Sequence, residues 1–281
     1  MKLIECPRDA MQGWHSPIST EDKISYLNAL LKVGFDTLDC GSFVSPKAIP
    51  QMADTALVIP RLKRAGSRSK LLAIVANQRG AEEAVVFDEI DYLGYPFSIS
   101  ETFQLRNTNK TIADSLELVD SLQELCIKNS KQLVVYISMG FGNPYGDPYD
   151  EAVALQWVDE LVKMNIHTIS LADTVGVATP DVITRLFASL IPAYPTVEFG
   201  AHFHSAPYNW EEKVAAAYEQ GCRRFDSAIK GIGGCPMAKD ELVGNLATEN
   251  LLDYCVRQHE ALKLDIAALT AAQQIAERIF I

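Results

Sequence analysis

Residues 197–204 read Val-Glu-Phe-Gly-Ala-His-Phe-His, and this stretch combines an apolar face with a polar one. Side chains two positions apart in a β-strand point to the same side. The odd-numbered residues therefore form an apolar face, while the even-numbered ones form a polar face that ends in His202 and His204. The stretch predicts a strand that packs on other elements and carries two potential metal ligands at its carboxyl end. Taken alone, the two histidines could also be half-exposed strand residues.

Strand-like runs alternate with helical patterns from one end of the chain to the other. Residues 24–31 illustrate the helical segments, because their apolar side chains recur three and four positions apart. Ser19 or Thr20, Thr111 and Thr179 are suitable N-caps, and Gly34 is a suitable helix terminator. The predicted strands are residues 2–6, 37–40, 71–75, 92–95, 133–138, 168–172, 197–204 and 224–229.

Eight strand–helix units follow one another without a linker, a composition break or a low-complexity tract. This order predicts an α/β protein with a closed (β/α)8 TIM barrel. We expect a single domain over residues 1–281, with the barrel ending near residue 245 and closing helices at 245–258 and 265–279. An open doubly wound sheet is the alternative, but no Gly-x-Gly-x-x-Gly turn follows the first strand.

The composition argues against several classes of partner. With a net charge of −11, the chain is a poor match for nucleic acid or an anionic membrane surface. The six cysteines include no Cys-x-x-Cys pair, as is typical of reduced thiols in the cytosol. No apolar run approaches the length of a membrane span, and no signal-peptide core follows Met1. These features predict a cytoplasmic globular protein. An anionic substrate would need a local positive centre, such as a metal ion or an arginine.

Polar residues gather at the carboxyl ends of the predicted strands rather than at the amino ends. In a barrel these ends meet at one mouth, where the chemistry of this fold takes place. Two histidines and the carboxylate of Asp9 would offer nitrogen and oxygen ligands suited to Mg²⁺, Mn²⁺ or Zn²⁺. The lack of a thiolate partner makes zinc the weaker candidate. The polar residues at these ends are Arg8, Asp9, Asp39, Ser42, Asp173, Thr174, His202, His204 and Lys230.

Strand parity bears on the first of these ends. Asp9 is an even number of residues from Glu5, so it is expected to face the barrel interior, with Arg8 curling over the rim. Arg8 and Asp9 could instead form an ion pair in a loop. Asp39 could be a buried cap of the next turn, and Asp173 could be an Asx-turn residue.

Residues 231–236 read Gly-Ile-Gly-Gly-Cys-Pro and form a second informative stretch. Three glycines in four positions give a backbone that can hinge, as a lid over a barrel mouth requires. Cys235 is then a candidate reactive thiol at the tip of the lid. A phosphate-binding loop is the rival interpretation, although no Gly-Lys-Ser/Thr follows, and a purely structural turn is the third.

Six short sequence motifs are spread along the chain between residues 7 and 249. They are Pro-Arg-Asp-Ala-Met-Gln at 7–12, Ser-Phe-Val-Ser-Pro-Lys at 42–47, Asp-Thr-Val-Gly at 173–176, His-Phe-His at 202–204, the glycine-rich loop at 231–238, and Gly-Asn-Leu-Ala-Thr-Glu at 244–249. Together they resemble the 3-hydroxy-3-methylglutaryl-CoA lyases, within the larger group of metal-dependent TIM-barrel lyases and acyl transferases. The resemblance extends from the first strand to residue 250. The second and fifth motifs are the lyase-specific ones.

The resemblance implies an activity and a set of site residues. The activity would be divalent-metal-dependent cleavage of an acyl-CoA substrate, 3-hydroxy-3-methylglutaryl-CoA, to acetyl-CoA and acetoacetate. A homodimer is suggested as well. The implied metal ligands are Asp9, His202, His204 and Asn245, with Mg²⁺ or Mn²⁺ as the cation rather than Zn²⁺. The implied catalytic residues are Arg8, Asp39, Asp173 and Cys235, and the implied substrate contacts are Arg8, Gln12 and Thr174.

The chain departs from the family pattern at several positions. Ala10 replaces a glycine, and Asp39 replaces a glutamate, which shortens the side chain by one methylene. Ser205 follows the second histidine, where an aspartate is common. These departures leave the acyl group open. A related aldolase or Claisen-type acyl transferase for a 2-oxo acid is one alternative, and a non-catalytic acyl-CoA-binding barrel is another.

Overall fold

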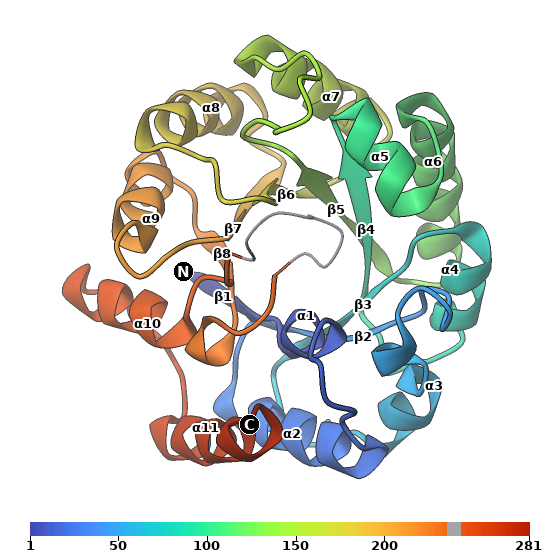
Figure 1. The fold of residues 1–281 in the computed structure, drawn as a ribbon, viewed down its shortest axis with the longest axis vertical. Coiled ribbons are helices and arrows are strands. Elements are labelled where there is room, and N and C mark those ends of the chain that lie inside the picture. The colour runs from blue at the N-terminus through green and yellow to red at the C-terminus, as the bar shows by residue number, and fades with distance from the viewer. Residues whose placement is uncertain (235–242) are drawn as a thin grey trace.

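The computed structural model describes residues 1–234 and 243–281 and contains a closed barrel of parallel strands inside a ring of helices (Figure 1). The strands are β1 (Lys2–Glu5), β2 (Thr37–Ser42), β3 (Lys70–Ile74), β4 (Tyr92–Ser98), β5 (Gln132–Ser138), β6 (Thr168–Asp173), β7 (Glu198–Phe203) and β8 (Arg224–Ser227). Strands that follow each other in sequence are neighbours in the barrel, and β8 closes against β1 through pairs such as Phe225 with Leu3. The predicted (β/α)8 TIM barrel is therefore confirmed.

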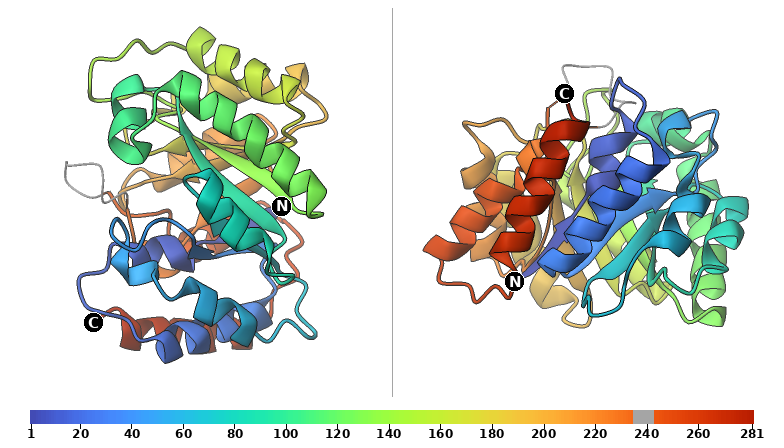
Figure 2. Two further views of the ribbon diagram at one scale, coloured as in Figure 1. Left: turned by 90° about the vertical axis from the view of Figure 1, so that its right-hand side faces the viewer. Right: turned by 90° about the horizontal axis from the view of Figure 1, so that it is seen from below.

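Most helices form a ring outside the strands, while α1 (Pro7–Gln12) lies inside this ring, next to the ends of the first strands (Figure 1). The other helices are α2 (Thr20–Val33), α3 (Thr55–Val58), α4 (Gln78–Val85), α5 (Glu101–Thr108), α6 (Ile112–Lys128), α7 (Glu151–Lys163), α8 (Pro180–Ala193), α9 (Trp210–Glu219), α10 (Thr248–Arg257) and α11 (Ile266–Ile279), with short 3-10 turns η1 (Pro50–Met52), η2 (Ile59–Arg61) and η3 (Ile229–Gly231). The last helix, α11, packs beside α2 and so joins the two ends of the chain (Figure 2). Among the described residues, no helix has the length and apolarity needed to cross a bilayer.

The helix ends follow from the local sequence. The Ser19 hydroxyl accepts a hydrogen bond from a backbone N–H in the first turn of α2 at 3.1 Å, and Thr111 forms a capping box with Asp114. The Thr179 side chain caps α8. Gly34 ends α2 in the left-handed conformation, with a φ of 84° that favours glycine. These predicted caps are confirmed.

Strand β7 has the two faces that its sequence predicts. Its odd-numbered residues, from Phe199 to Phe203, are buried in the core, and His202 on the other face is half-buried. The strand ends at Phe203, one residue earlier than predicted. His204 lies just beyond it and forms an isolated bridge with Asn245.

Two predictions about the first strands are wrong. Strand β1 ends at Glu5, and Pro7 begins α1. Proline is favourable at the first helical position because its missing N–H would have no partner there. Arg8 and Asp9 therefore lie on a helix, and strand parity does not apply to them. Strand β2 continues past residue 40 through an irregularity in its register with β3, so Asp39 lies within the strand rather than at its end.

Candidate active site

Arg8 is held by two carboxylates at the carboxyl end of the barrel. Its Nε donates to Oδ2 of Asp39 at 2.9 Å, its Nη2 donates to the same carboxylate, and its Nη1 donates to Oδ1 of Asp9 at 2.9 Å. All three residues are at most 8% exposed. Although burial opposes the charge, Asp39 and Asp9 raise the pKa of Arg8. The guanidinium is therefore a permanent and oriented positive group at the mouth.

Asp9, His202 and His204 bring their ligand atoms within 4.8 Å of one another. The Nδ1 atom of His202 lies 3.0 Å from a carboxylate oxygen of Asp226, and the Nδ1 atom of His204 donates to the carbonyl of Thr174 at 2.9 Å. The Nε2 atom of His204 is buried and has no hydrogen-bond partner among residues 1–234 and 243–281. An orphaned imidazole nitrogen beside a second imidazole and a carboxylate fits the ligand set of a divalent cation.

The protonation states of these side chains also suit a cation. Burial lowers the pKa of His204 to about 4, so the imidazole is neutral at pH 7. Although burial opposes ionisation, Arg8 lowers the pKa of Asp9. Although burial opposes its charge, Asp226 raises the pKa of His202. An anionic carboxylate and a neutral imidazole are the forms that bind metals, so the pair of Asp9 and His204 needs no change of protonation.

Asn245 joins the cluster from the segment that follows β8. Its Nδ2 donates to Oδ2 of Asp9 at 2.7 Å and to the carbonyl of Ile232 at 2.9 Å. The amide oxygen is therefore the atom left to serve as a ligand. Gly233 packs directly against this side chain, because a Cβ at that position would come within 2.4 Å of the Asn245 nitrogen. The four predicted ligands lie together, while their role as ligands stays a prediction.

A buried thiol lies beside the cluster. Cys6, His202 and Asp226 form a second group whose ligand atoms lie within 4.8 Å of one another. Burial raises the pKa of the Cys6 thiol well above its ordinary value. A protonated thiol is a poor metal ligand, so the group of Asp9 and the two histidines remains the better candidate.

Asp173 is occupied by an ion pair. Its carboxylate accepts a hydrogen bond from Nζ of Lys213 at 2.7 Å and another from the N–H of Ala178 at 3.0 Å. Lys213 is 1% exposed, and its Nζ also donates to the carbonyl of His204 at 3.0 Å. Among the described residues that line the cavity at the mouth, neither Asp173 nor Asp39 is present. Asp173 therefore does not line this cavity, although Thr174 beside it does, and Lys213 links it to the backbone of a predicted metal ligand.

The cavity at the mouth has a volume of about 230 Å³. Gln12 lines it and donates from Nε2 to Asp9 at 2.9 Å. Thr174 lines it as well, and its hydroxyl accepts a hydrogen bond from the N–H of Met139 at 2.9 Å. Both predicted substrate contacts thus border the same space as Arg8. Cys235, the predicted loop thiol, lies outside the described residues.

Two residues with clear roles in this arrangement, Asp226 and Lys213, were missed by reasoning from sequence. Asp226 could have been predicted from the sequence, because Arg224 and Asp226 alternate with other residues in β8 and share the face opposite the buried Phe225. Lys213 could not. A lysine on an amphipathic helix usually extends into solvent, and only the fold places this one behind β6 and β7.

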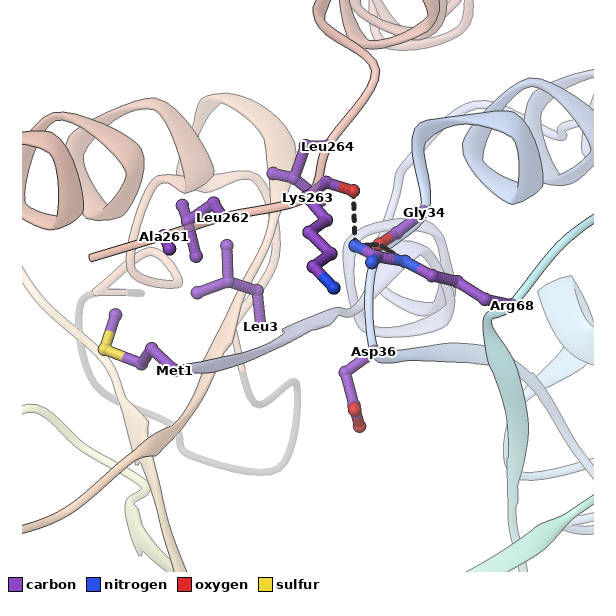
Figure 3. Close-up of a pocket in the computed structure, with 9 residues that line it drawn as sticks. All are labelled: Met1, Leu3, Gly34, Asp36, Arg68, Ala261, Leu262, Lys263 and Leu264. Carbon is purple, nitrogen blue, oxygen red and sulfur yellow. Dashed lines mark hydrogen bonds between the residues drawn. The ribbon is translucent and has the colours of Figure 1, made fainter.

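A second cavity, of about 260 Å³, lies near the amino ends of the first strands (Figure 3). Its guanidinium, from Arg68, donates to the backbone carbonyls of Gly34 and Lys263. Asp36 also lines the cavity but is not joined to Arg68 by a hydrogen bond in Figure 3. Arg68 and Asp36 are thus not paired with each other, whereas the charged groups at the mouth converge on one another.

Comparison with known proteins decides the family. The sequence model of the HMGL-like family matches residues 3–276. The chain belongs to the HMGL-like family. The resemblance carried by the six motifs is thereby confirmed.

Relatives of this HMGL-like protein match it over most of their length. A 3-hydroxy-3-isohexenylglutaryl-CoA/hydroxymethylglutaryl-CoA lyase of Pseudomonas aeruginosa is 33% identical over 90% of this chain and 83% of its own. Hydroxymethylglutaryl-CoA lyase YngG of Bacillus subtilis is 32% identical over 97% of this chain and 91% of its own. The solved structure of an HMG-CoA lyase from Acinetobacter baumannii, in complex with coenzyme A and 3-methylmalate, superposes with a TM-score of 0.91 at 31% identity and covers 100% of this chain and 91% of that one.

Proposed function

We propose that this HMGL-like protein is a carbon–carbon lyase that cleaves 3-hydroxy-3-methylglutaryl-CoA to acetyl-CoA and acetoacetate. The observation that carries the proposal is a fixed guanidinium, Arg8, beside the cluster of Asp9, His202 and His204 in one cavity. Relatives named for this reaction align with most of the chain. The substrate is accordingly an acyl-CoA thioester.

Cleavage of this substrate makes three chemical demands. The tertiary hydroxyl loses its proton, the C2–C3 bond breaks with its electron pair moving to C2, and the resulting thioester enolate takes up a proton. A divalent cation held by Asp9, His202, His204 and Asn245 would supply Lewis acidity for the hydroxyl group. Two oxygen and two imidazole ligands without a thiolate favour Mg²⁺ or Mn²⁺ over Zn²⁺.

Arg8 meets the demand for charge stabilisation in this proposal. Its guanidinium is already oriented by Asp39 and Asp9, so no reorganisation is needed when charge develops on the thioester oxygen. A single donor of this kind typically contributes about 10²–10³ in rate. Asp39 positions the guanidinium. Burial raises the pKa of Asp39 to about 6 against the opposing effect of Arg8.

The remaining predicted residues divide into contacts and supports. Gln12 and Thr174 border the cavity, so we keep them as substrate contacts. For Asp173 we propose a positioning role, because Lys213 connects it to the carbonyl of His204. Cys235 as the acid that protonates the enolate rests on the family resemblance alone, as does the homodimer.

The deciding experiment incubates the protein with 3-hydroxy-3-methylglutaryl-CoA and Mg²⁺ or Mn²⁺ and follows acetoacetate with and without EDTA. We expect product with the cation and its loss on chelation. The absence of product at every metal concentration would overturn the proposed function.

A second measurement tests the ligand set independently of activity. Electron paramagnetic resonance of bound Mn²⁺ should show a large loss of affinity in His204→Ala, because this imidazole nitrogen has no other buried partner among the described residues. His167→Ala removes an exposed histidine that does not line the cavity and is the matched control. If His204→Ala binds Mn²⁺ as tightly as the wild type, the ligand assignment is wrong, while the lyase proposal stands on its own assay.

A further inference from the structure

A thiol, an imidazole and a carboxylate meet at the inner side of the predicted metal cluster. The ligand atoms of Cys6, His202 and Asp226 lie within 4.8 Å of one another. Cys6 follows β1, and the other two residues are paired in register on the neighbouring strands β7 and β8. Of the three, only His202 is among the described residues that line the cavity at the mouth. The proposed lyase chemistry leaves the thiol without a role.

This group has ligand atoms that are not fully engaged. Oδ2 of Asp226 lies 3.0 Å from Nδ1 of His202, but Oδ1 is buried and has no hydrogen-bond partner among residues 1–234 and 243–281. The Asp226 side chain is 1% exposed. The Sγ atom of Cys6 makes a weak contact, at 3.8 Å, to the carbonyl of Ile4. Because a buried carboxylate oxygen without a partner is costly, the group can gain free energy by binding a cation.

The spacing of the group suits a small divalent cation. Two ligands that lie about 2.0 Å from one ion at a tetrahedral angle are about 3.3 Å apart. The 3.0 Å between Nδ1 of His202 and Oδ2 of Asp226 is close to this value. A thiolate lies slightly further from the ion, at about 2.3 Å. One nitrogen, one oxygen and one sulfur ligand, with water in the fourth position, match the composition of an open zinc site.

The surroundings of Cys6 select the kind of cation. Burial raises the pKa of its thiol, and so do three nearby carboxylates, those of Asp226, Asp39 and Asp9. One guanidinium, from Arg8, opposes them. Mg²⁺ and Mn²⁺ prefer oxygen ligands and leave such a thiol protonated. A thiophilic cation displaces the proton, because the metal–sulfur bond and the nearby carboxylates both stabilise the bound ion.

We propose that Cys6, His202 and Asp226 form a second metal site, the inner site, for a thiophilic divalent cation such as Zn²⁺ or Cd²⁺. When the ion binds, the sulfur–hydrogen bond of Cys6 breaks, its electron pair forms the metal–sulfur bond, and the proton passes to solvent. No oxidant, reductant or further reactant takes part. The inner site itself does not depend on the proposed lyase function.

His202 makes the inner site and the proposed catalytic metal site mutually exclusive. A neutral imidazole offers one nitrogen to a metal and carries its proton on the other. An ion in the inner site takes Nδ1, the nitrogen that faces Asp226, so the proton moves to Nε2. Asp9 and His204 then lose Nε2 of His202 as a fellow ligand. A thiophilic ion therefore inhibits by expelling the catalytic cation, and this part of the inference rests on the ligand set of the proposed function.

Cadmium binding tests the inner site directly. The full chain, freed of metal by a chelator and dialysed, is titrated with Cd²⁺ while the ultraviolet charge-transfer band of a cadmium–thiolate bond is recorded. We expect this band in the wild type and in the matched control Cys222→Ser, whose buried thiol contacts backbone carbonyls. Cys6→Ser should abolish the band and weaken Cd²⁺ binding about 100-fold or more, because one of three protein ligands is lost.

Two results would overturn the inner site. One is the absence of the band in the wild type. The other is a band that persists in Cys6→Ser and disappears in Cys235→Ser, because the ion would then be bound to Cys235. Should Cys6→Ser fail to fold, as judged by circular dichroism, Cys6→Ala provides the same comparison without a buried hydroxyl.

Competition with Mn²⁺ tests the exclusion. Electron paramagnetic resonance follows Mn²⁺ bound to the wild type, and one equivalent of Cd²⁺ should release it. In Cys6→Ser the same release should need about 100-fold more Cd²⁺. Equal release in the two proteins, or a cadmium–thiolate band without release of Mn²⁺, would overturn the exclusion. If the wild type binds no Mn²⁺, the ligand set of the proposed function fails, while the cadmium band still decides the inner site.

Discussion

The two ends of the barrel carry similar side chains in opposite surroundings. At the carboxyl end, Arg8 is 8% exposed and is fixed by two buried carboxylates. At the amino end, Arg68 is exposed and bonds to backbone carbonyls, while Lys2 pairs with Glu198 through side chains that are 48% and 32% exposed. Charges removed from water interact strongly, whereas solvated pairs are screened. The surroundings, rather than the residue types, therefore distinguish the end that can do chemistry.

Lys213→Met should produce the largest effect on stability. It leaves the carboxylate of Asp173 buried without its partner, which typically costs about 3–5 kcal/mol of unfolding free energy. It also frees the carbonyl of His204, so Mn²⁺ affinity should fall about 10–100-fold. Urea unfolding measures the first effect, and Mn²⁺ titration of the folded protein measures the second.

The amino end provides the matched control for this prediction. Lys2→Met breaks the exposed pair with Glu198 and should cost less than about 1 kcal/mol. The double variant Lys213→Met with Asp173→Asn should recover part of the lost stability, because no charge is then left without a partner. Equal costs for the two lysine variants would contradict the contrast between the ends.

Arg8→Lys should lower kcat by about 10²–10³. Lysine keeps the positive charge but cannot make the forked contacts to Asp39 and Asp9 at the same time. Steady-state kinetics with 3-hydroxy-3-methylglutaryl-CoA measures the loss. Arg68→Lys is the control at the other end and should change kcat by less than about twofold, because its contacts are to exposed backbone. If Arg8→Lys retains the wild-type kcat, the fixed orientation of the guanidinium does not contribute to catalysis.

The barrel could be predicted because short stretches of sequence determine its strands and the ends of its helices. Alternating faces in 197–204, helix caps such as Thr111, and the terminator Gly34 each depend on a few adjacent residues. The errors lie at the ends of β1 and β2, where a proline-initiated helix and an irregular register decide the boundary. Both depend on packing beyond the strand itself, so the parity argument for Asp9 failed although its place at the mouth was right.

The site could be predicted only where residues form part of a motif. Arg8, Asp9, His202 and His204 follow strands in recognisable patterns, and the topology brings them together. The ion pair of Asp173 with Lys213 could not be predicted from the sequence, because these two residues lie on different elements and meet only after α9 packs on the barrel. Buried partners of this kind determine whether a polar residue at the mouth faces the substrate or supports its neighbours.

Glu5→Gln should produce a smaller effect that depends on pH. Glu5 is fully buried at the end of β1, where its carboxyl group accepts hydrogen bonds from the N–H of Ile229 at 2.8 Å and from the hydroxyl of Thr248 at 2.6 Å. Burial raises the pKa of this acid from its ordinary 4.5 to about 8. The folded protein thus holds a proton that the unfolded chain has released between these two values.

The sign of the effect follows from proton linkage. The stability that the neutral acid contributes is fully present below pH 4.5 and is lost as pH rises toward 8, by at most about 1.4 kcal/mol per pH unit. Glutamine keeps the shape and can still accept from Ile229 and donate to Thr248, but it has no proton to lose. The stability of Glu5→Gln relative to the wild type should therefore rise between pH 5 and pH 8 in urea unfolding. Glu277→Gln, in an ion pair whose two side chains are open to solvent, should change the unfolding free energy by less than about 1 kcal/mol at pH 7. If the difference in unfolding free energy between the wild type and Glu5→Gln stays constant from pH 5 to pH 8, Glu5 is ionised in the folded protein. The buried carboxyl end of the barrel would then tolerate a charge, as the exposed amino end does.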